Sequence, residues 1–237
     1  MTKITNSIPA AKAVKAKTAK GAKAIEKLKL AAMVVLERDG FHKMRIGDVT
    51  KEAGVAAGLF YHYFSDLKTL TLEVLNDFLV RFQDLETIEK DVPKGDWYAR
   101  MYAHHLLSVR SHAEHPGIMR CMEQMADEDE AFAGRWRSSK RQQLQWLAAL
   151  MPKLFPEAGF SEHQALMVVY TLGGTGEGIL RDYYINDDVE LKKQQLSIEE
   201  MAELLTVTFY RGLFLENPPA DKLAYTANLQ AMVRKEY

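Results

Sequence analysis

Apolar residues recur at spacings of three and four along most of the chain, which is the period of amphipathic helices. Near the N-terminus, Ile25, Leu28 and Val35 share one face of a helix that Gly40 is expected to end. Two short helices are predicted next, one on each side of a break at residues 53–55, and a long helix follows them. This order of elements is the first organisational feature of the sequence.

The break between the two short helices, Ala53-Gly54-Val55, is typical of the turn of a helix-turn-helix. Gly54 supplies the left-handed backbone that is needed just past a helix end. In the second short helix Phe60 and Phe64 stand four residues apart, so both rings point from one face into a core. The residues on the opposite side and its rim can enter a major groove. They are Ala57, Gly58, Leu59, Tyr61, His62 and Tyr63.

The helical period continues through the rest of the chain. It predicts a helix over residues 97–112, a short helix around Met122, and a longer helix from the acidic run 127–130 to a stop before Phe155. Another helix is expected to run from Ala220 towards the C-terminus. Two further helices are expected to begin at capping boxes. The boxes are Ser161-x-x-Gln164 and Ser197-x-x-Glu200.

The charge of the chain is unevenly distributed. The 237 residues carry a formal net charge of −1, yet residues 1–30 contain eight lysines and one acidic residue. Within residues 1–20 there is no apolar period and Pro9 interrupts the chain, which predicts a disordered basic arm. Such an arm either contacts phosphates or the minor groove of DNA, or serves only as a solubilising tail.

Cysteine and histidine usage gives little support for a metal or redox site. Cys121 is the single cysteine, so no intramolecular disulfide can form, which fits a reducing cytoplasm. His112 and His115 have a spacing that metal ligands use, but they stand at a predicted helix end beside Pro116. The run Gly173–Gly178 lacks the preceding strand and the following Lys-Ser/Thr pair of a phosphate loop, and is expected to allow a close helix crossing or a local break.

Residues 24–75 resemble the DNA-binding domain of the TetR family of bacterial transcriptional regulators. The residues that carry this resemblance are Gly40-Phe41, Ile46-x-Asp48-Val49, Ala53-Gly54-Val55, Gly58-x-Phe60-Tyr61-x-Tyr63-Phe64 and Leu70. The sequence departs from the family pattern at Arg45, where the family usually has a capping threonine, and at Leu67, where lysine is common and Lys68 stands one place later. The usual serine before the recognition helix is Ala56, and the usual polar residue after Gly58 is Leu59.

The resemblance implies an all-α fold with three segments. These are a basic arm (1–20), a three-helix helix-turn-helix DNA-binding domain (21–80, with the motif at about 45–64) and a larger helical ligand-binding and dimerisation domain (81–237). It further implies a homodimer joined through its last long helices, which binds a palindromic operator in the cytoplasm, on the nucleoid. The resemblance carries a phosphate-contact role over to Tyr61, Arg45 and Lys68. The other predicted DNA contacts follow from the open side of the second short helix, and they are Ala57, Gly58, Leu59, His62 and Tyr63.

The family's mode of action implies a repressor that a small molecule releases from DNA, with no enzymatic activity, catalytic residue, metal or cofactor. Aromatic and methionine side chains on the predicted inward faces of the second domain indicate an apolar or aromatic effector that can carry an acidic group. The residues expected to contact this effector are Trp97, Met101, His105, Met122, Met125, Trp136 and Tyr170. The same side chains can form an ordinary hydrophobic core. Two functions from other classes remain open at this point: an all-helical metal-dependent enzyme, and a DNA-packaging protein that uses the basic arm.

Overall fold

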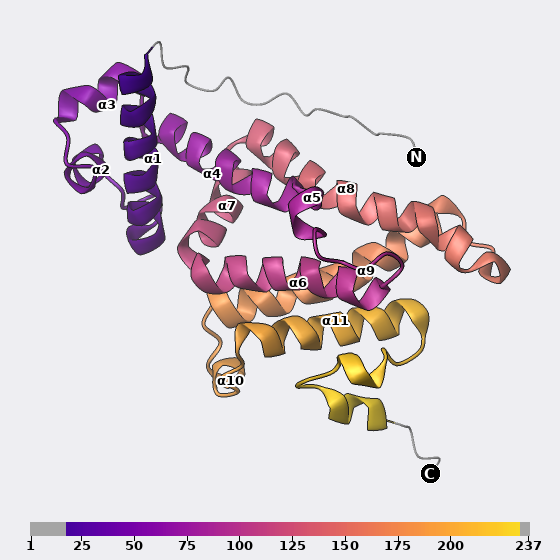
Figure 1. The fold of residues 1–237 in the computed structure, drawn as a ribbon. Coiled ribbons are helices and arrows are strands. Elements are labelled where there is room, and N and C mark those ends of the chain that lie inside the picture. The colour runs from indigo at the N-terminus through magenta and orange to yellow at the C-terminus, as the bar shows by residue number, and fades with distance from the viewer. Residues whose placement is uncertain (1–17, 233–237) are drawn as a thin grey trace. The chain divides into compact units, whose positions relative to one another are not determined.

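The computed structural model describes residues 18–232, apart from the side chains at positions 81–83, 140 and 143 (Figure 1). Within this range the chain is helical and contains no strand, so the predicted all-α fold class is confirmed. The chain forms two compact units. Among the described residues, the N-terminal unit contains residues 18–83 and 117–139, and the C-terminal unit contains residues 84–116 and 140–232.

Side-chain caps account for the starts of α1 and α4 in the N-terminal unit. The side chain of Thr18 accepts a hydrogen bond from the Gly21 amide, so the last residues of the predicted arm already belong to the first helix, while residues 1–17 lie outside the described range. Asp66 caps the fourth helix through the Thr69 amide at 2.7 Å. The helices are α1 (Ala19–Asp39), α2 (Ile46–Glu52), α3 (Ala57–Tyr63), α4 (Leu67–Gln83), α7 (Pro116–Glu128) and α8 (Glu130–Leu154), the last of which continues past residue 139 into the C-terminal unit.

Helix α7 belongs to the N-terminal unit because its first turn is bound to the end of α1. The Glu37 carboxylate accepts hydrogen bonds from the backbone amides of Gly117 at 2.7 Å and Ile118 at 2.9 Å. These amides are the donors that a helix start leaves without partners inside the helix. The sequence assigned residues 117–139 to the second domain, and it contains no local signal for this contact, which joins positions 80 residues apart.

The C-terminal unit is built around α6 (Trp97–Glu114) and α11 (Ile198–Phe214), which run side by side (Figure 1). Its other helices are α5 (Leu85–Ile88), the second part of α8, α9 (Glu162–Leu180) and α10 (Val189–Lys192). Both predicted capping boxes are confirmed, since Ser161 and Ser197 accept from the amides three residues later and the side chains of Gln164 and Glu200 reciprocate. The helix with the glycine-rich run does not break there. It continues to Leu180 and then widens into a π-helical turn, Arg181–Ile185.

Side chains from α6, α8, α9 and α11 form the core of the C-terminal unit. One cluster surrounds Met101, Met151 and Val169, and a second surrounds Val109, Leu180 and Met201. The crossing of α9 and α11 is close at Gly212, where an added Cβ would lie 2.5 Å from Leu172 Cδ2. In the part of the chain that the structure covers, no helix combines the length and the apolar character needed to cross a membrane.

The helix predicted from Ala220 to the C-terminus is wrong. Residues 215–232, here called the C-terminal strap, contain only the short 3-10 turns Ala220–Lys222 and Ala227–Ala231. The physical reason is that the buried carboxylate of Glu203 accepts hydrogen bonds from the backbone amides of Ala224, Tyr225 and Thr226. A helix through these residues would direct the same amides to carbonyls within its own turns instead.

Candidate DNA-binding interface

The turn between α2 and α3 has the geometry that its sequence predicts. Gly54 has a φ of +60°, in the left-handed region, and its amide donates to the Lys51 carbonyl at 3.0 Å. The Val55 amide donates to the Thr50 carbonyl at 3.0 Å, which closes the turn. Ala53 is buried at the helix crossing. The turn is therefore held by its own backbone, and this fixes the direction in which α3 leaves it.

Helix α3 is anchored on one side and open on the other. Phe60 and Phe64 are almost fully buried and their ring centroids lie 5.9 Å apart, as predicted from their spacing. Tyr61 is 64% exposed, although its ring packs edge-on against Phe60 with the centroids 5.5 Å apart. The remaining predicted contact residues of α3 follow the same division. Ala57, Gly58 and His62 are exposed, whereas Leu59 and Tyr63 are half-buried.

Gly58 is not required by the packing of this chain. A Cβ added at this position would have no atom within 4 Å, and the backbone is not in the left-handed region. A glycine inside a helix costs about 0.5–1 kcal/mol relative to alanine. Because nothing inside the protein compensates for this cost, the small size of residue 58 is explained best by something that approaches α3 from outside.

Arg45 stands at the start of α2 and makes only part of a capping box. Its backbone amide donates to Asp48 Oδ2 at 2.9 Å, but a guanidinium has no acceptor with which to reciprocate. The side chain turns instead to the preceding loop, where Nη1 donates to the carbonyls of His42 at 3.0 Å and Met44 at 3.1 Å. The guanidinium is therefore fixed beside the helix start while remaining exposed.

Lys68 is placed differently from the other predicted contact residues. Its Nζ lies 3.1 Å from Asp129 Oδ2 and donates to the Glu128 carbonyl at 3.4 Å, so it links the start of α4 to the junction of α7 and α8. The pKa of Asp129 is lowered, mainly by the Phe132 amide and further by Lys68. A phosphate contact by Lys68 would require this ion pair to open.

The residues predicted to contact an effector are divided between the two units. Met122, Met125 and Trp136 belong to the N-terminal unit, where both methionines are fully buried. The other residues of the set, Trp97, Met101, His105 and Tyr170, belong to the C-terminal unit.

His105, a member of the effector set, has a hydrogen-bonded side chain in the C-terminal unit. Its Nδ1 lies 3.1 Å from Thr206 Oγ1, whose hydroxyl donates to the Ala202 carbonyl at 2.7 Å. Burial, and then the neighbouring His104, lower the pKa of His105 to about 4, so this imidazole is neutral at neutral pH.

The other histidines of α6 are hydrogen-bonded to protein groups. His104 Nε2 lies 2.9 Å from Glu89 Oε1, and His112 Nδ1 lies 2.8 Å from the carbonyl of Ser108. Across residues 18–232, no cluster of three or more His, Cys, Asp or Glu side chains is arranged to hold a metal ion. Cys121 is buried, and burial raises the pKa of its thiol.

Comparison with known proteins agrees with this reading of α1–α4. Residues 30–74 match the sequence profile of the family described as bacterial regulatory proteins, tetR family. No curated protein sequence gives a significant match to the chain.

Solved structures of similar fold cover most of the chain. A TetR-like transcriptional regulator from Rhodococcus sp. RHA1 has 19% identity and a TM-score of 0.60, over 81% of this chain and 97% of that one. A TetR-family transcriptional regulator from Bordetella parapertussis 12822 has 16% identity and a TM-score of 0.57, over 85% and 99%. The transcriptional regulator FadR from Bacillus subtilis, solved in complex with stearoyl-CoA, has 14% identity and a TM-score of 0.57, over 79% and 98%.

The low identities of these structures establish only the shared fold, while the match at residues 30–74 establishes the kind of domain. The geometry of α2, the turn and α3 is that of a helix-turn-helix, with one side of α3 free to meet DNA. From the family match and this geometry together, residues 30–74 form an N-terminal helix-turn-helix domain of the tetR family of bacterial regulatory proteins, in a chain that shares the fold of TetR-family transcriptional regulators.

Proposed function

We propose that the protein is a ligand-responsive repressor that binds a palindromic operator as a homodimer in the cytoplasm and is released by an apolar or aromatic small molecule. The observation that carries the DNA-binding part is the two-sided character of α3, with Phe60 and Phe64 buried and Tyr61, His62 and Gly58 exposed. A helix held so firmly on one side can present the other side to a major groove without rearrangement.

Within this interface the residues have different roles. Tyr61 and Arg45 contact phosphates, which position the protein without reading sequence. His62 is the exposed side chain of α3 that can hydrogen-bond a base edge, and Tyr63 supports it, because the two rings pack edge-on with centroids 4.7 Å apart. Ala57, Gly58 and Leu59 permit close approach of the backbone and offer apolar contact to thymine methyl groups. Lys68 joins this set only when its pair with Asp129 opens.

Replacing Tyr61 with phenylalanine is expected to weaken binding to every DNA sequence by about a hundredfold or more. A hydrogen bond to a charged group contributes about 1.5–3 kcal/mol, and a dimer loses two of them. The fold should be unaffected because the Tyr61 ring, which packs against Phe60, is retained. Fluorescence titration of operator and unrelated duplexes at one salt concentration measures the effect. Tyr225→Phe, which removes the hydroxyl of an exposed tyrosine on the C-terminal strap, is the control. If Tyr61→Phe changed only the preferred base at one position, the phosphate role would be wrong.

The homodimer proposal is supported by the exposed face of α9. Met167 is 53% exposed and the exposed Tyr170 follows one turn later on the same face, and neighbouring exposed apolar side chains can mark an interaction site. A Cβ added at Gly174 or Gly178 would meet nothing within 4 Å, so the same helix also offers positions where another backbone can approach closely. A second copy covering this face would bring two helix-turn-helix motifs to two half-sites. Sedimentation showing only monomer at micromolar concentration would contradict this proposal.

The effector proposal is supported by the apolar and aromatic content of the C-terminal unit and by one structural neighbour. The Bacillus subtilis FadR has the same fold and was solved with stearoyl-CoA, a long acyl chain carrying a charged group. Met101 and Trp97, both in the predicted effector set, belong to one hydrophobic cluster of the present chain. The neutral His105 beside them can donate or accept a hydrogen bond without an electrostatic cost.

Thermal-shift screening is expected to find hydrophobic carboxylic acids or aromatic compounds that raise the melting temperature, since a ligand that binds only the folded state stabilises it. The same compounds should lower the affinity for operator fragments selected from genomic DNA. Stabilisation by sugars or divalent metal ions alone would contradict the effector class. Selection of no preferred fragment would contradict the repressor function itself.

A further inference from the structure

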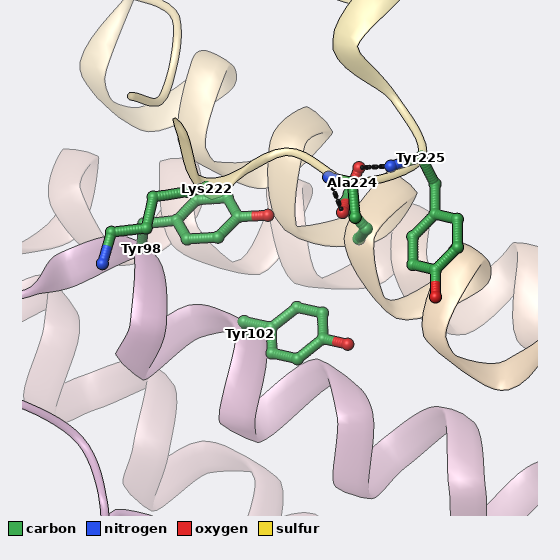
Figure 2. A pocket seen from close by; sticks show the side chains of 6 residues that line it. Tyr98, Tyr102, Lys222, Ala224 and Tyr225 are labelled. Atoms are coloured by element: carbon green, nitrogen blue, oxygen red, sulfur yellow. Dashed lines mark hydrogen bonds between the residues drawn. The ribbon is translucent and has the colours of Figure 1, made fainter. Parts of the chain in front are cut away.

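A buried carboxylate of α11 holds the middle of the C-terminal strap, and Arg211 of α11 binds its later part by donating to the Leu229 carbonyl at 3.1 Å. Glu203 is 3% exposed and its two oxygens accept four hydrogen bonds from the strap. These come from the backbone amides of Ala224 at 2.9 Å, Tyr225 at 2.7 Å and Thr226 at 2.6 Å, and from the Thr226 hydroxyl at 2.7 Å. The strap is therefore positioned over α6 and α11, and Figure 2 shows the space that it leaves above α6.

That space is a cleft of about 330 Å³ with an aromatic lining. Its walls are Tyr98 and Tyr102 of α6, Glu203 of α11, and Lys222, Ala224 and Tyr225 of the strap (Figure 2). The rings of Tyr98 and Tyr102 are nearly parallel, with an angle of 14° and centroids 6.4 Å apart, so they form one continuous aromatic wall along α6. The Tyr225 ring lies at the other side of the cleft, on the strap.

The three tyrosine hydroxyl groups of the cleft have no hydrogen-bond partner among the described residues. Tyr98 is only 6% exposed as a residue, but its hydroxyl is not among the fully buried unpaired polar atoms, so the tip of this side chain reaches the cleft. Burial, followed by nearby carboxylates, raises the pKa of both Tyr98 and Tyr102, so these phenols stay neutral. The cleft thus contains neutral aromatic rings with polar tips that are available to solvent or to a ligand.

The charge at the cleft is unbalanced towards the negative side. All four partners of Glu203 are neutral N–H or O–H groups, and no described cation pairs with it. Lys222 does not balance this carboxylate, because its Nζ lies 3.0 Å from Asp96 Oδ2 and forms an ion pair there. One buried carboxylate therefore stands behind the aromatic wall without a counter-ion.

We propose that this cleft is a binding site for a small organic cation, such as an alkylammonium or quaternary ammonium compound. The faces of aromatic rings attract cations, and rings of several tyrosines around a quaternary ammonium group are a recognised arrangement for this purpose. The unbalanced charge of Glu203 adds attraction for a cation and disfavours an anion. A metal ion is a poor fit, because hard cations need free oxygen ligands and both oxygens of Glu203 are occupied by hydrogen bonds. The site does not depend on the effector proposed above.

Choline and its neutral isostere 3,3-dimethylbutan-1-ol test the proposal, because the two differ chiefly in the charge. With the full-length protein, calorimetric titration should show choline binding at least tenfold more tightly than the neutral alcohol. Tyr225 is the best position for substitution, since the residue is 51% exposed. It is bound to Glu203 through its backbone amide, so a change of its side chain leaves that hydrogen bond in place. Tyr225→Ala should weaken choline binding at least fivefold, and Tyr225→Phe should retain it, because the ring rather than the hydroxyl attracts the cation.

Met232→Ala, a substitution at an exposed residue of the strap that does not line the cleft, serves as the control and should leave choline binding unchanged. The proposal is wrong if choline does not bind at millimolar concentration, if the neutral alcohol binds equally well, or if Tyr225→Ala has no effect. Neither the operator affinity nor the response to hydrophobic acids enters these measurements, so failure here is distinguishable from failure of the proposed repressor function.

Discussion

Replacing Gly117 with alanine is expected to destabilise the N-terminal unit by about 3–5 kcal/mol. A Cβ at this position would lie 2.2 Å from the backbone oxygen of Glu37 and 2.7 Å from its Cα. Backbone atoms of a helix cannot turn aside as the end of a side chain can, so α1 and α7 would have to separate. Overpacking costs about 1–3 kcal/mol, and the two hydrogen bonds from the first turn of α7 to the Glu37 carboxylate would weaken at the same time.

Urea denaturation followed by circular dichroism measures this change, with Gly134→Ala as the matched control. Gly134 lies inside α8, is exposed, and has nothing within 4 Å of an added Cβ. There alanine should stabilise the helix by about 0.5–1 kcal/mol because glycine is the poorer helix former. The same glycine-to-alanine substitution is thus expected to lower the free energy of unfolding at position 117 and to raise it at position 134. If both substitutions had similar effects, the close contact of α1 and α7 would not exist in solution.

Replacing Glu203 with glutamine is expected to release the C-terminal strap, at a cost of about 2–4 kcal/mol. A carboxylate can accept all four hydrogen bonds, whereas the amide keeps one acceptor oxygen and points an NH₂ group at backbone N–H donors. Hydrogen exchange at the amides of residues 224–226 should become much faster, and the urea midpoint should fall. Glu162→Gln, an exposed position at the start of α9, is the control and should change stability by less than about 0.5 kcal/mol. Unchanged exchange in the Glu203 variant would contradict the anchoring role.

The Glu203 carboxylate is also expected to make the stability of the strap depend on pH. Burial by itself would raise the pKa of Glu203, but the hydrogen bonds from the strap outweigh it, so the pKa is lowered from its ordinary value of 4.5. The unfolded chain therefore takes up a proton at this site at a higher pH than the folded chain does. The stability contributed by Glu203 is complete above about pH 4.5 and is lost as the pH falls through the lower pKa of the folded state. The wild-type protein should lose strap protection in this acidic range, and the glutamine variant should show no such step.

Local sequence rules were sufficient for the elements that carry DNA recognition. The left-handed glycine at position 54, the four-residue spacing of Phe60 and Phe64, and the cap at Asp66 all act within one or two helical turns. Each is decided by backbone sterics or by a hydrogen bond to a residue three or four positions away. The position and orientation of α3 could therefore be predicted without the fold, and the family resemblance rested on the same residues.

Tertiary structure decided the features that depend on a partner far away in the chain. Glu37 determines that α7 belongs with the DNA-binding helices, Asp129 pairs with Lys68, and Glu203 prevents the chain after Ala220 from forming the helix that its sequence suggested. In each case a charged side chain binds a backbone amide or an opposite charge that lies between 21 and 81 positions away in the sequence. No periodicity or spacing reveals such a pair, because the energy of a buried or half-buried charge depends on which groups the packed helices bring within hydrogen-bond distance.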